Sequence, residues 1–388
     1  MSFSQQQGQA IQAVRKWLAD PTAPQVFRLF GFAGSGKTTI AKELAKEVNG
    51  SVRFACFTGK AALVLRKKGC TGASTIHSLI YKPVTIPEAV VVEQAPDGTE
   101  LVRKTPRRVD FELDPASPAG FASLLIIDEV SMVGEDIALD LLSFGTRVLV
   151  LGDPAQLPPV FGEGFFINAT PDFMLTEVHR QAQDNPIIRM SMDVREGRSL
   201  NVGKYGSSLV VPRFSLRQQA LQEMLAASDQ VLCGTNRTRQ SLNTLIRFQK
   251  RLAGVGNPAM PAVGDRVVCL KNKRDKSLFN GGLFDVVAVA NDENFSQMEV
   301  RSLDEDADNV HIQVPSELFI VSDKKKNFYD HRMYEEFTYG WALTVHKSQG
   351  SQWGNVTVFD ESASFKEHAA KHLYTAITRA EEKVTVIV

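Results

Sequence analysis

The stretch Gly31-Phe-Ala-Gly-Ser-Gly36-Lys37-Thr38 decides the fold of this 388-residue chain. It matches G-x-x-x-x-G-K-[ST], a turn whose glycines let backbone N–H groups surround a phosphate at a helix N-terminus. The segment Val26-Phe-Arg-Leu-Phe30 before it predicts a strand, and residues 38–48 after it predict a helix. Strand, glycine-rich turn and helix together favour a nucleotide-binding loop over the alternative, a turn with an exposed lysine.

The polar residues of this turn have separate expected roles. Lys37 would reach the β- and γ-phosphates of ATP, and the Thr38 hydroxyl would hold Mg²⁺. The residues expected to contact the nucleotide in this segment are Gly31, Gly34, Ser35, Gly36, Lys37, Thr38 and Thr39.

A second signal is the apolar run at residues 124–127, which predicts a buried strand. The run ends in Asp128-Glu129, and burying a bare carboxylate is costly unless a cation accompanies it. We expect Asp128 to hold Mg²⁺ through water and Glu129 to position and activate the attacking water. The second acid favours hydrolysis over phosphoryl transfer to a metabolite, although both acids could instead cap a helix.

Strands and helices alternate along two parts of the chain, as they do in parallel α/β sheets. In the first part the further strands expected are 52–57 and 147–151, with helices at 60–68 and 135–142. In the second part the strands expected are 230–233, 356–359 and 383–388, with helices at 237–252 and 371–378. The pattern therefore predicts two α/β units.

Two β-rich stretches interrupt this alternation. Within residues 84–118, apolar segments at 90–92 and 100–102 flank Ala95-Pro-Asp-Gly98, and the Asp-Gly pair favours a β-hairpin. From residue 263 to about 320, short strands separated by Gly and Asn turns predict a small β-barrel inserted into the second unit.

The net charge and the N-terminal sequence exclude only some classes of protein. Lys+Arg and Asp+Glu both number 44, which excludes a histone-like protein but leaves nucleic-acid binding through a local patch. Residues 1–80 hold eleven basic and three acidic residues, a net +8, so a polyanion partner and a solvated basic face are both open. The polar start has no signal-peptide pattern and no run approaches ~18 apolar residues, so we expect a cytoplasmic protein without a membrane partner.

Five further segments resemble motifs of superfamily 1 helicases. They are Ser4-Gln-Gln-Gln7-Gly-Gln-Ala10-Ile11, Leu151-Gly-Asp-Pro-Ala-Gln156-Leu-Pro-Pro-Val160, Leu175-Thr-Glu-Val-His-Arg180-Gln, Thr344-Val-His-Lys-Ser-Gln-Gly350-Ser and Leu373-Tyr-Thr-Ala-Ile-Thr-Arg379-Ala. Thr58-Gly-Lys-Ala-Ala62 and Ser74-Thr-Ile-His77 narrow the resemblance to the RecD-type helicases of subgroup B, which include phage Dda-like enzymes. Phe57, where the subgroup usually has Pro, and Gln352, in place of Glu, depart from the pattern.

The resemblance implies an α/β fold with two RecA-like P-loop motor domains. The first would comprise residues 1–83 and 119–187, with residues 84–118 as a β-hairpin pin insertion. The second would comprise residues 188–260 and 335–388, with residues 261–334 as an SH3-like β-barrel insertion. ATP would lie in the cleft between the domains, with single-stranded DNA across both.

The resemblance also implies catalytic roles. Gln156 would contact the γ-phosphate, and Arg180 and Arg379 would act as arginine fingers. Together with Lys37 and Glu129, these residues form the expected catalytic set.

Binding roles follow from the same resemblance. Gln7 would bind adenine, although Ser4 and Gln7 also fit a helix capping box, and Gly350 would complete the nucleotide site. The expected DNA-contacting residues are Phe57, Thr58, Lys60, His77, Thr235, Asn236, Thr344, His346 and Lys347. For the aromatic residue and the two histidines of this set, a structural role is the alternative.

The implied function is ATP-dependent unwinding of duplex DNA by movement 5′→3′ along single-stranded DNA, in replication, repair or recombination. ATP and Mg²⁺ are the implied cofactors. The implied partners are single-stranded DNA, its junctions with duplex, and single-strand-binding or replisome proteins, and the motor would be monomeric. Two alternatives stay open: an RNA helicase or nucleic-acid-stimulated ATPase of the same superfamily, and an AAA+-type assembly ATPase.

Overall fold

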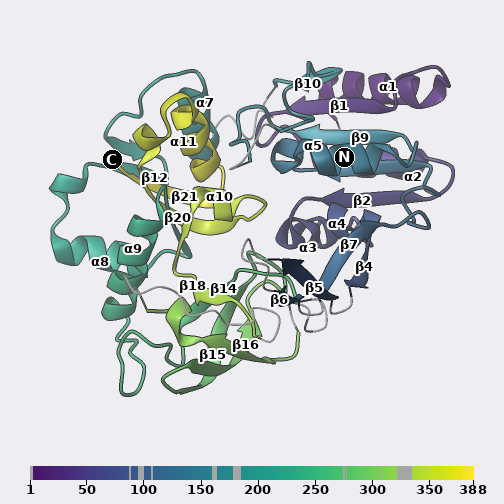
Figure 1. Cartoon of the computed structure of the whole chain (residues 1–388). Coiled ribbons are helices and arrows are strands. Elements are labelled where there is room, and N and C mark those ends of the chain that lie inside the picture. Colours follow the sequence, from purple (N-terminus) through teal and green to yellow (C-terminus); the bar gives the residue numbers. More distant parts are fainter. Residues whose placement is uncertain are drawn as a thin grey trace.

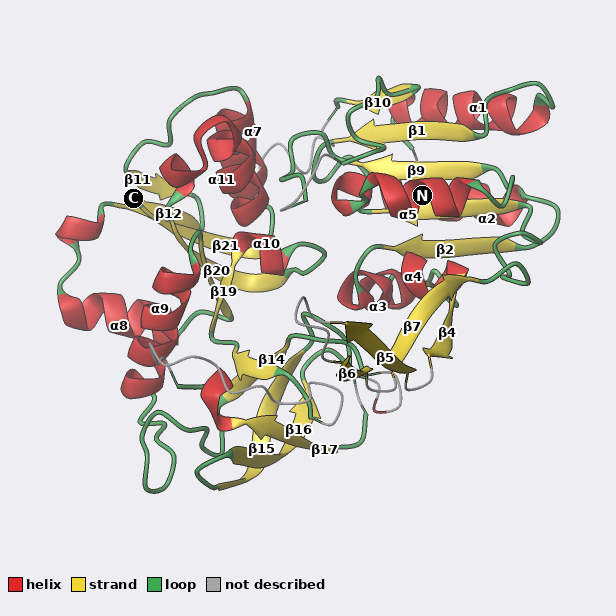
Figure 2. Ribbon diagram, in the orientation of Figure 1, coloured by secondary structure: helices red, strands yellow, loops and turns green. Residues whose placement is uncertain are grey.

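Two α/β bodies face each other, and an antiparallel sheet lies next to both (Figure 1). The computed structural model describes residues 3–86, 89–94, 100–105, 108–159, 164–177, 185–273, 276, 278–305, 307–320 and 334–388. Figure 2 shows helices against the sheet of each body. Among the helices in these ranges, none is both long and apolar enough to cross a membrane.

The first body is built on a six-stranded parallel sheet. In spatial order its strands are β10 (Phe173–Leu175), β1 (Val26–Gly31), β9 (Val148–Gly152), β8 (Leu124–Asp128), β2 (Val52–Cys56) and β3 (Ser74–Thr75). Its helices are α1 (Gln5–Ala19), α2 (Lys37–Glu47), α3 (Gly59–Lys67), α4 (Ile76–Ile80) and α5 (Glu135–Leu142).

Helices on both faces of this sheet bury every residue of β8 and β9. Leu124 and Ile126 of β8 pack with α1 and α2, whereas Leu125 and Ile127 pack with α4 and α5. Because neither face of the sheet meets solvent at β8, the sequence of this strand does not alternate between polar and apolar residues. The strands and helices expected in this part of the chain lie within one residue of the observed bounds.

The second body contains a six-stranded mixed sheet. In spatial order its strands are β11 (Gly203–Tyr205), β12 (Ser208–Val211), β21 (Ala380–Ile387), β20 (Trp353–Phe359), β13 (Gln230–Cys233) and β19 (Ala342–Thr344). Its helices include α7 (Pro186–Arg195), α8 (Gln218–Ala226), α9 (Asn236–Gln249), α10 (Val345–Ser348) and α11 (Ala369–Ile377). The β11–β12 pair is antiparallel and the remaining neighbours are parallel.

Helix α9 ends before the expected residue 252. Arg251 adopts a left-handed φ of 57°, and the Leu252 N–H donates to the Arg247 carbonyl at 2.9 Å. This is the hydrogen-bond pattern that closes a helix at its C-terminus. The apolar Leu252 therefore belongs to the closing turn.

The predicted β insertion of the second body is a five-stranded antiparallel sheet between α9 and β19. Its strands in spatial order are β17 (Val310–Pro315), β16 (Phe295–Ser302), β15 (Leu283–Asn291), β14 (Arg266–Cys269) and β18 (Phe337–Tyr339). Strand β18 lies beyond the expected end of the insertion at residue 334. The Glu335 N–H donates to the Gln313 carbonyl at 3.0 Å, so the two ends of the sheet approach each other.

The insertion in the first body is a longer ribbon than expected. Strand β4 (Tyr81–Ile86) pairs with β7 (Arg108–Leu113), and β5 (Ala89–Gln94) pairs with β6 (Glu100–Thr105). The predicted hairpin strands fall in β5 and β6, and the Asp97-Gly98 turn lies outside the described residues. Pairing begins at Tyr81, three residues before the expected boundary at 84.

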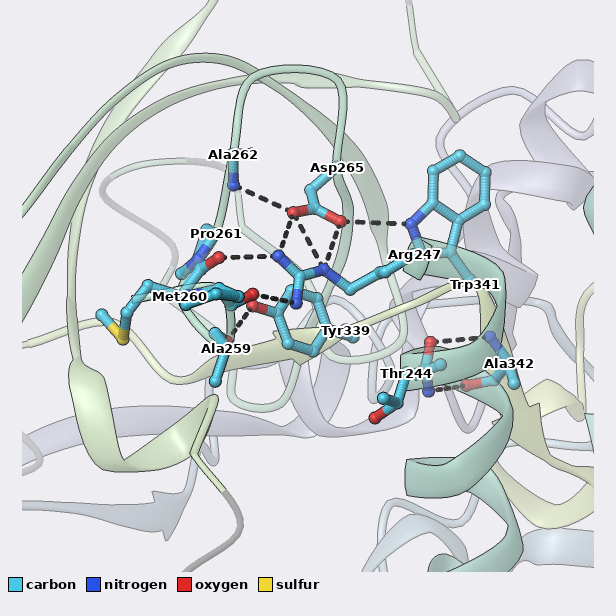
Figure 3. A network of polar contacts seen from close by, with 12 residues as sticks. Thr244, Arg247, Ala259, Met260, Pro261, Ala262, Asp265, Tyr339, Trp341 and Ala342 are labelled. Atoms are coloured by element: carbon cyan, nitrogen blue, oxygen red, sulfur yellow. Dashed lines mark hydrogen bonds and ion pairs between the residues drawn. The ribbon is translucent and has the colours of Figure 1, made fainter. Parts of the chain in front are cut away.

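A buried ionic network joins the five-stranded sheet to α9 (Figure 3). The Arg247 Nε and Asp265 Oδ1 atoms are 2.9 Å apart, and both side chains are almost fully buried. Asp265 also accepts the Trp341 indole N–H at 3.3 Å, and Arg247 donates to the Met260 carbonyl at 2.6 Å. The Tyr339 ring lies 4.1 Å from the guanidinium carbon. Both ends of the insertion are thus anchored to one helix.

Asp265→Ala should lower the free energy of unfolding by about 3–5 kcal/mol, because Arg247 would keep a buried charge without its carboxylate. Denaturant unfolding of the whole chain measures this loss. Glu43→Gln is the matched control, since it removes an exposed pair with Lys46 at 2.7 Å and should change the stability little. An equal, small effect of both substitutions would contradict the structural role assigned to the network.

Candidate active site

A cavity of about 360 Å³ lies between the two bodies. The first body lines it with the glycine-rich turn, the acidic end of β8 and the loop after β9, and the second body with residues around Gly350 and Arg379. Lining residues that the sequence predicts are Gly34, Gly36, Lys37, Thr38, Thr39, Asp128, Glu129, Gln156, Gly350 and Arg379. Residues from distant motifs therefore meet at one place.

The glycine-rich turn is a close-packed cradle. Gly34 and Gly36 have φ values of 76° and 84°, which side chains rarely adopt. A Cβ on Gly31 would lie 2.6 Å from the Ser35 Oγ atom. Lys37 donates to the carbonyl of Gly31 at 2.6 Å, so its ammonium lies across the mouth of the turn. The backbone N–H groups and this cation suit a phosphate.

Gln7 supports the turn from behind. Its Nε2 donates to the Ser35 carbonyl at 2.9 Å, and its side chain and Ser4 form the capping box of α1. Gln7 is buried and is not one of the residues on the cavity wall. The capping alternative is thus observed, and adenine contact stays a prediction.

Asp128 and Thr38 form the candidate Mg²⁺ position. The Thr38 Oγ1 donates to the Asp128 Oδ2 at 2.9 Å, and burial together with the Glu129 charge raises the Asp128 pKa. Glu129 has a φ of 55°, a strained conformation for this residue type. Oxygen ligands and an uncompensated carboxylate fit a hard divalent cation that keeps several waters.

Gln156 and Arg379 approach the cavity from opposite bodies. Gln156 is buried, and its Oε1 has no hydrogen-bond partner among the described residues. Arg379 is also buried, and its Nε donates to the Thr375 carbonyl at 3.1 Å. Arg180 lies outside the described residues. At the cavity wall this amide oxygen is free to accept a hydrogen bond from a ligand or from water.

The three threonines that were expected to contact DNA are N-caps of helices that begin where strands end. Thr58 accepts the Ala61 N–H at 3.2 Å. Thr235 accepts the Thr238 N–H at 3.2 Å at the start of α9, and Thr344 caps α10. These side chains shape the helix starts at the edges of the two sheets.

Lys60 differs most from its expected placement. Its ammonium lies 3.2 Å from Asp304 of the inserted sheet and 4.6 Å from the centre of the Trp353 ring. The side chain is 7% exposed, and burial lowers its pKa. Lys60 thus pairs with a carboxylate of its own chain, and its contact with DNA stays a prediction.

A groove of about 1270 Å³ runs between α9, α10 and the inserted sheet. Asn236, Thr344 and Lys347, which the resemblance predicts to contact DNA, line it. Arg239 and the exposed Phe248, which were not predicted, line it as well. The spacing of Asn236, Arg239 and Asn243 along one face of α9 was the available signal.

The remaining expected contacts lie apart from this groove. Phe57 packs against the core of the first body, which is the structural alternative. His77 lies on α4, with its ring centre 4.5 Å from that of Phe111. His346 lies 5.8 Å from the ring of Phe365.

Comparison with known proteins assigns the chain to a family. Residues 3–211, more than half of the chain, match a family model described as an AAA domain. The chain belongs to this family. Residues 339–387 match a second model, described as a UvrD-like helicase C-terminal domain. Within its family, the chain is of the superfamily 1 RecD/Pif1 type.

Two curated relatives illustrate the similarity. The chain is 30% identical to an ATP-dependent RecD2 DNA helicase of Deinococcus radiodurans over 92% of its own length and 46% of the relative's. It is 23% identical to an ATP-dependent DNA helicase Pif1 of Bdellovibrio bacteriovorus over 83% and 75%. The AAA-domain chain thus spans about half the length of the RecD2 relative.

Solved structures share the fold. A crystal structure of Bacteroides Pif1 bound to ssDNA has a TM-score of 0.55 at 20% identity, covering 99% of this chain and 92% of that one. A structure titled for DNA unwinding at forked dsDNA by two coordinating Pif1 helicases has a TM-score of 0.54 at 19% identity, covering 99% and 92%. The two α/β bodies of the AAA-domain chain are therefore RecA-like domains.

Gly36→Ala should destabilise the protein more than Gly72→Ala. Both glycines have a left-handed φ, 84° and 76°, which costs about 1–2 kcal/mol for alanine. At Gly36 the new Cβ would also lie 2.5 Å from the Gln7 Nε2, whereas nothing lies within 4 Å at Gly72. Denaturant midpoints of the two variants measure the difference, and equal midpoints would contradict the packing of Gln7 on the turn.

His372 should make the protein acid-sensitive. It is fully buried, its ring nitrogens have no partner among the described residues, and burial with the nearby His346 lowers its pKa to about 4. Its ordinary pKa is 6.5, so below that pH the unfolded chain takes up the proton first, and stability falls by about 3 kcal/mol towards pH 4.

Urea unfolding at a series of pH values tests this. His372→Leu should reduce the loss of stability between pH 6.5 and 4, whereas substitution of the exposed His311 by Gln should keep the parent profile. A parental slope in His372→Leu would exclude the buried ring as the cause.

Proposed function

We propose that this chain is an ATP-driven motor that moves 5′→3′ along single-stranded DNA and unwinds duplex DNA. One observation carries the proposal: a single cavity collects Lys37, Asp128 and Glu129 from one RecA-like body and Gly350 and Arg379 from the other. A site completed by two bodies couples their approach to hydrolysis. The UvrD-like match at residues 339–387 favours this motor over the assembly-ATPase alternative.

Each group has a task in phosphoryl transfer. The turn and Lys37 hold the phosphates, and Thr38 and Asp128 hold Mg²⁺, which supplies positive charge that neutralises phosphate oxygens. Glu129 orients and deprotonates the attacking water, and Gln156 contacts the γ-phosphate. Arg379, with Arg180 as the second arginine, stabilises charge that develops in the transition state.

The insertions are proposed to serve unwinding. Residues 84–118 act as a pin that meets the duplex, and residues 261–334 act as an SH3-like barrel. The first motor domain then comprises residues 1–83 and 119–187, and the second comprises residues 188–260 and 335–388. Pairing of β4 with β7 and of β14 with β18 extends the two insertions outward to Tyr81 and Tyr339.

Single-stranded DNA is proposed to lie in the groove along α9 and α10. Arg239 and Lys347 on its wall suit a phosphate backbone, and its apolar side chains, including Phe248, suit the faces of bases. Binding should then tolerate any sequence and weaken with salt. The motor is proposed to act as a cytoplasmic monomer on DNA junctions, with single-strand-binding or replisome proteins as partners.

A strand-displacement assay tests the proposal. With ATP and Mg²⁺, the parent chain should separate duplexes with a 5′ single-stranded tail, fail on 3′-tailed ones, and hydrolyse ATP faster with single-stranded DNA than without. Lys37→Ala should lose hydrolysis and unwinding but retain single-strand binding, since the groove does not include Lys37.

The control is Lys46→Ala, an exposed lysine on the same helix. Unwinding of 3′-tailed duplexes would overturn the polarity, and stimulation by RNA alone would overturn the choice of DNA. Parental hydrolysis by Lys37→Ala would remove the phosphate-binding assignment.

A further inference from the structure

The Tyr374 hydroxyl connects the two bodies beside the cavity. It accepts the Ala33 N–H of the glycine-rich turn at 3.0 Å and donates to the Asp153 Oδ2 at 2.7 Å. Tyr374 comes from α11 of the second body, whereas Ala33 and Asp153 belong to the first. All of this side chain is buried, at 1% exposure. One hydroxyl group therefore bridges two strand-end loops of the opposite body.

The direction of this chain of hydrogen bonds is determined by its ends. A backbone N–H can only donate, so the Tyr374 oxygen accepts from Ala33 and its own hydrogen is directed at the Asp153 carboxyl oxygen. Asp153 is 2% exposed, and the other hydrogen bond to its carboxyl group comes from the Ala155 N–H at 3.0 Å. A buried carboxylate with so few donors depends strongly on each.

The same helix holds the far end of the Gln156 loop. The Leu157 N–H donates to the Thr375 Oγ1 at 2.9 Å, and the Gln349 Nε2 donates to the Leu157 carbonyl at 2.9 Å. Asp153 and Leu157 lie on either side of Gln156 in sequence. Two adjacent residues of α11 thus hold both ends of the loop that carries Gln156.

Arg379 is oriented from the same turn of helix. Its Nε donates to the Thr375 carbonyl at 3.1 Å, one residue after Tyr374. Helix α7 adds a further contact, since the Arg195 guanidinium lies 3.6 Å from the centre of the Phe32 ring, beside Ala33. The outer side of the glycine-rich turn therefore packs on the second body, while its inner side faces the cavity.

We propose that Tyr374 is a positioning residue for nucleotide hydrolysis. It aligns the Gln156 loop, and Arg379 just after α11, with the phosphate-binding turn. This inference rests on the ATPase activity proposed above. The hydroxyl acts through Asp153 and Ala33 and does not itself line the cavity. Its loss should therefore alter the alignment of reacting groups more than the grip of Lys37 and Thr38 on ATP.

Tyr374→Phe removes only the hydroxyl and tests the proposal. We expect kcat for DNA-stimulated ATP hydrolysis to fall about tenfold or more, because small misplacements of catalytic groups cost that much. KM for ATP should change less than threefold. The experiment measures both constants on the full chain, together with denaturant unfolding of each variant.

Tyr205→Phe is the matched control. The Tyr205 hydroxyl also accepts one backbone N–H, from Asn201 at 2.8 Å, but it lies on the edge hairpin of the second sheet. Tyr205 is only partly buried, so this control compares the loss of a hydroxyl bonded to a backbone N–H and not its burial. If loss of such a hydroxyl only loosened the fold, both variants would lose activity in proportion to stability. The proposal expects parental kcat for Tyr205→Phe.

Asp153→Asn provides the second variant. If Tyr374 acts through Asp153, the variant with both substitutions should have a kcat no lower than that of the slower single variant. If the two residues acted independently, their fold-losses in kcat would multiply. If Tyr374→Phe does not fold, Asp153→Asn alone must show the same kcat loss with KM retained.

Parental kcat in Tyr374→Phe, or a rise in KM with kcat unchanged, would overturn the inference and leave the ATPase standing. A parent chain that does not hydrolyse ATP at all would overturn the proposed function, and this inference with it.

Discussion

Parallel pairing of β1, β9 and β8 brings the carboxyl ends of three buried strands to one edge of the first sheet. The segments that follow these strands carry the glycine-rich turn, Asp153 and the pair Asp128-Glu129. Because β8 and β9 are apolar on both faces up to their ends, and β1 has only Arg28 as a charged residue, the polar groups of the cavity gather at the strand ends. The cavity, its buried carboxylates and the contacts of α11 all depend on that edge.

The buried carboxylates at this edge need hydrogen-bond donors, and the donating hydroxyl groups come from different bodies. Asp153 receives the Tyr374 hydroxyl from the opposite body. Burial, followed by the charge of the adjacent Glu129, raises the pKa of Asp128, which accepts the Thr38 hydroxyl and an adjacent N–H of its own body. Each acid thus has one hydroxyl and one backbone N–H donor, and only Asp153 takes its hydroxyl from the opposite body. The second carboxylate beside Asp128, and not a shortage of donors, is the physical basis for proposing the cation there.

Sequence patterns predicted what depends on neighbours along the chain. The turn at Gly31–Thr38, the buried run at β8 and helix α5 need only local periodicity and turn chemistry. The family match supports the resemblance read from those motifs.

Features set by distant residues were missed or misplaced. Strands β12 and β18 are short, and their pairing partners β21 and β14 lie far away in sequence. Lys60 was expected at a nucleic acid from the resemblance, and the pairing with Asp304 was missed because the docking of that insertion is not visible in any local pattern. Tyr374 lies in a predicted helix, and the two partners of its hydroxyl belong to the other body, which no local pattern reveals.

The Arg247–Asp265 network attaches the inserted sheet to the second body. It fastens both ends of that sheet to α9 through several buried hydrogen bonds, whereas the contacts with α3 of the first body include the buried Lys60–Asp304 pair, the half-exposed Arg66–Glu305 pair and the Phe279 side chain beside Gly59. A residue attached to the second body thus covers the Lys60 ammonium of the first. A separation of the two bodies would remove this carboxylate and leave Lys60 open to solvent.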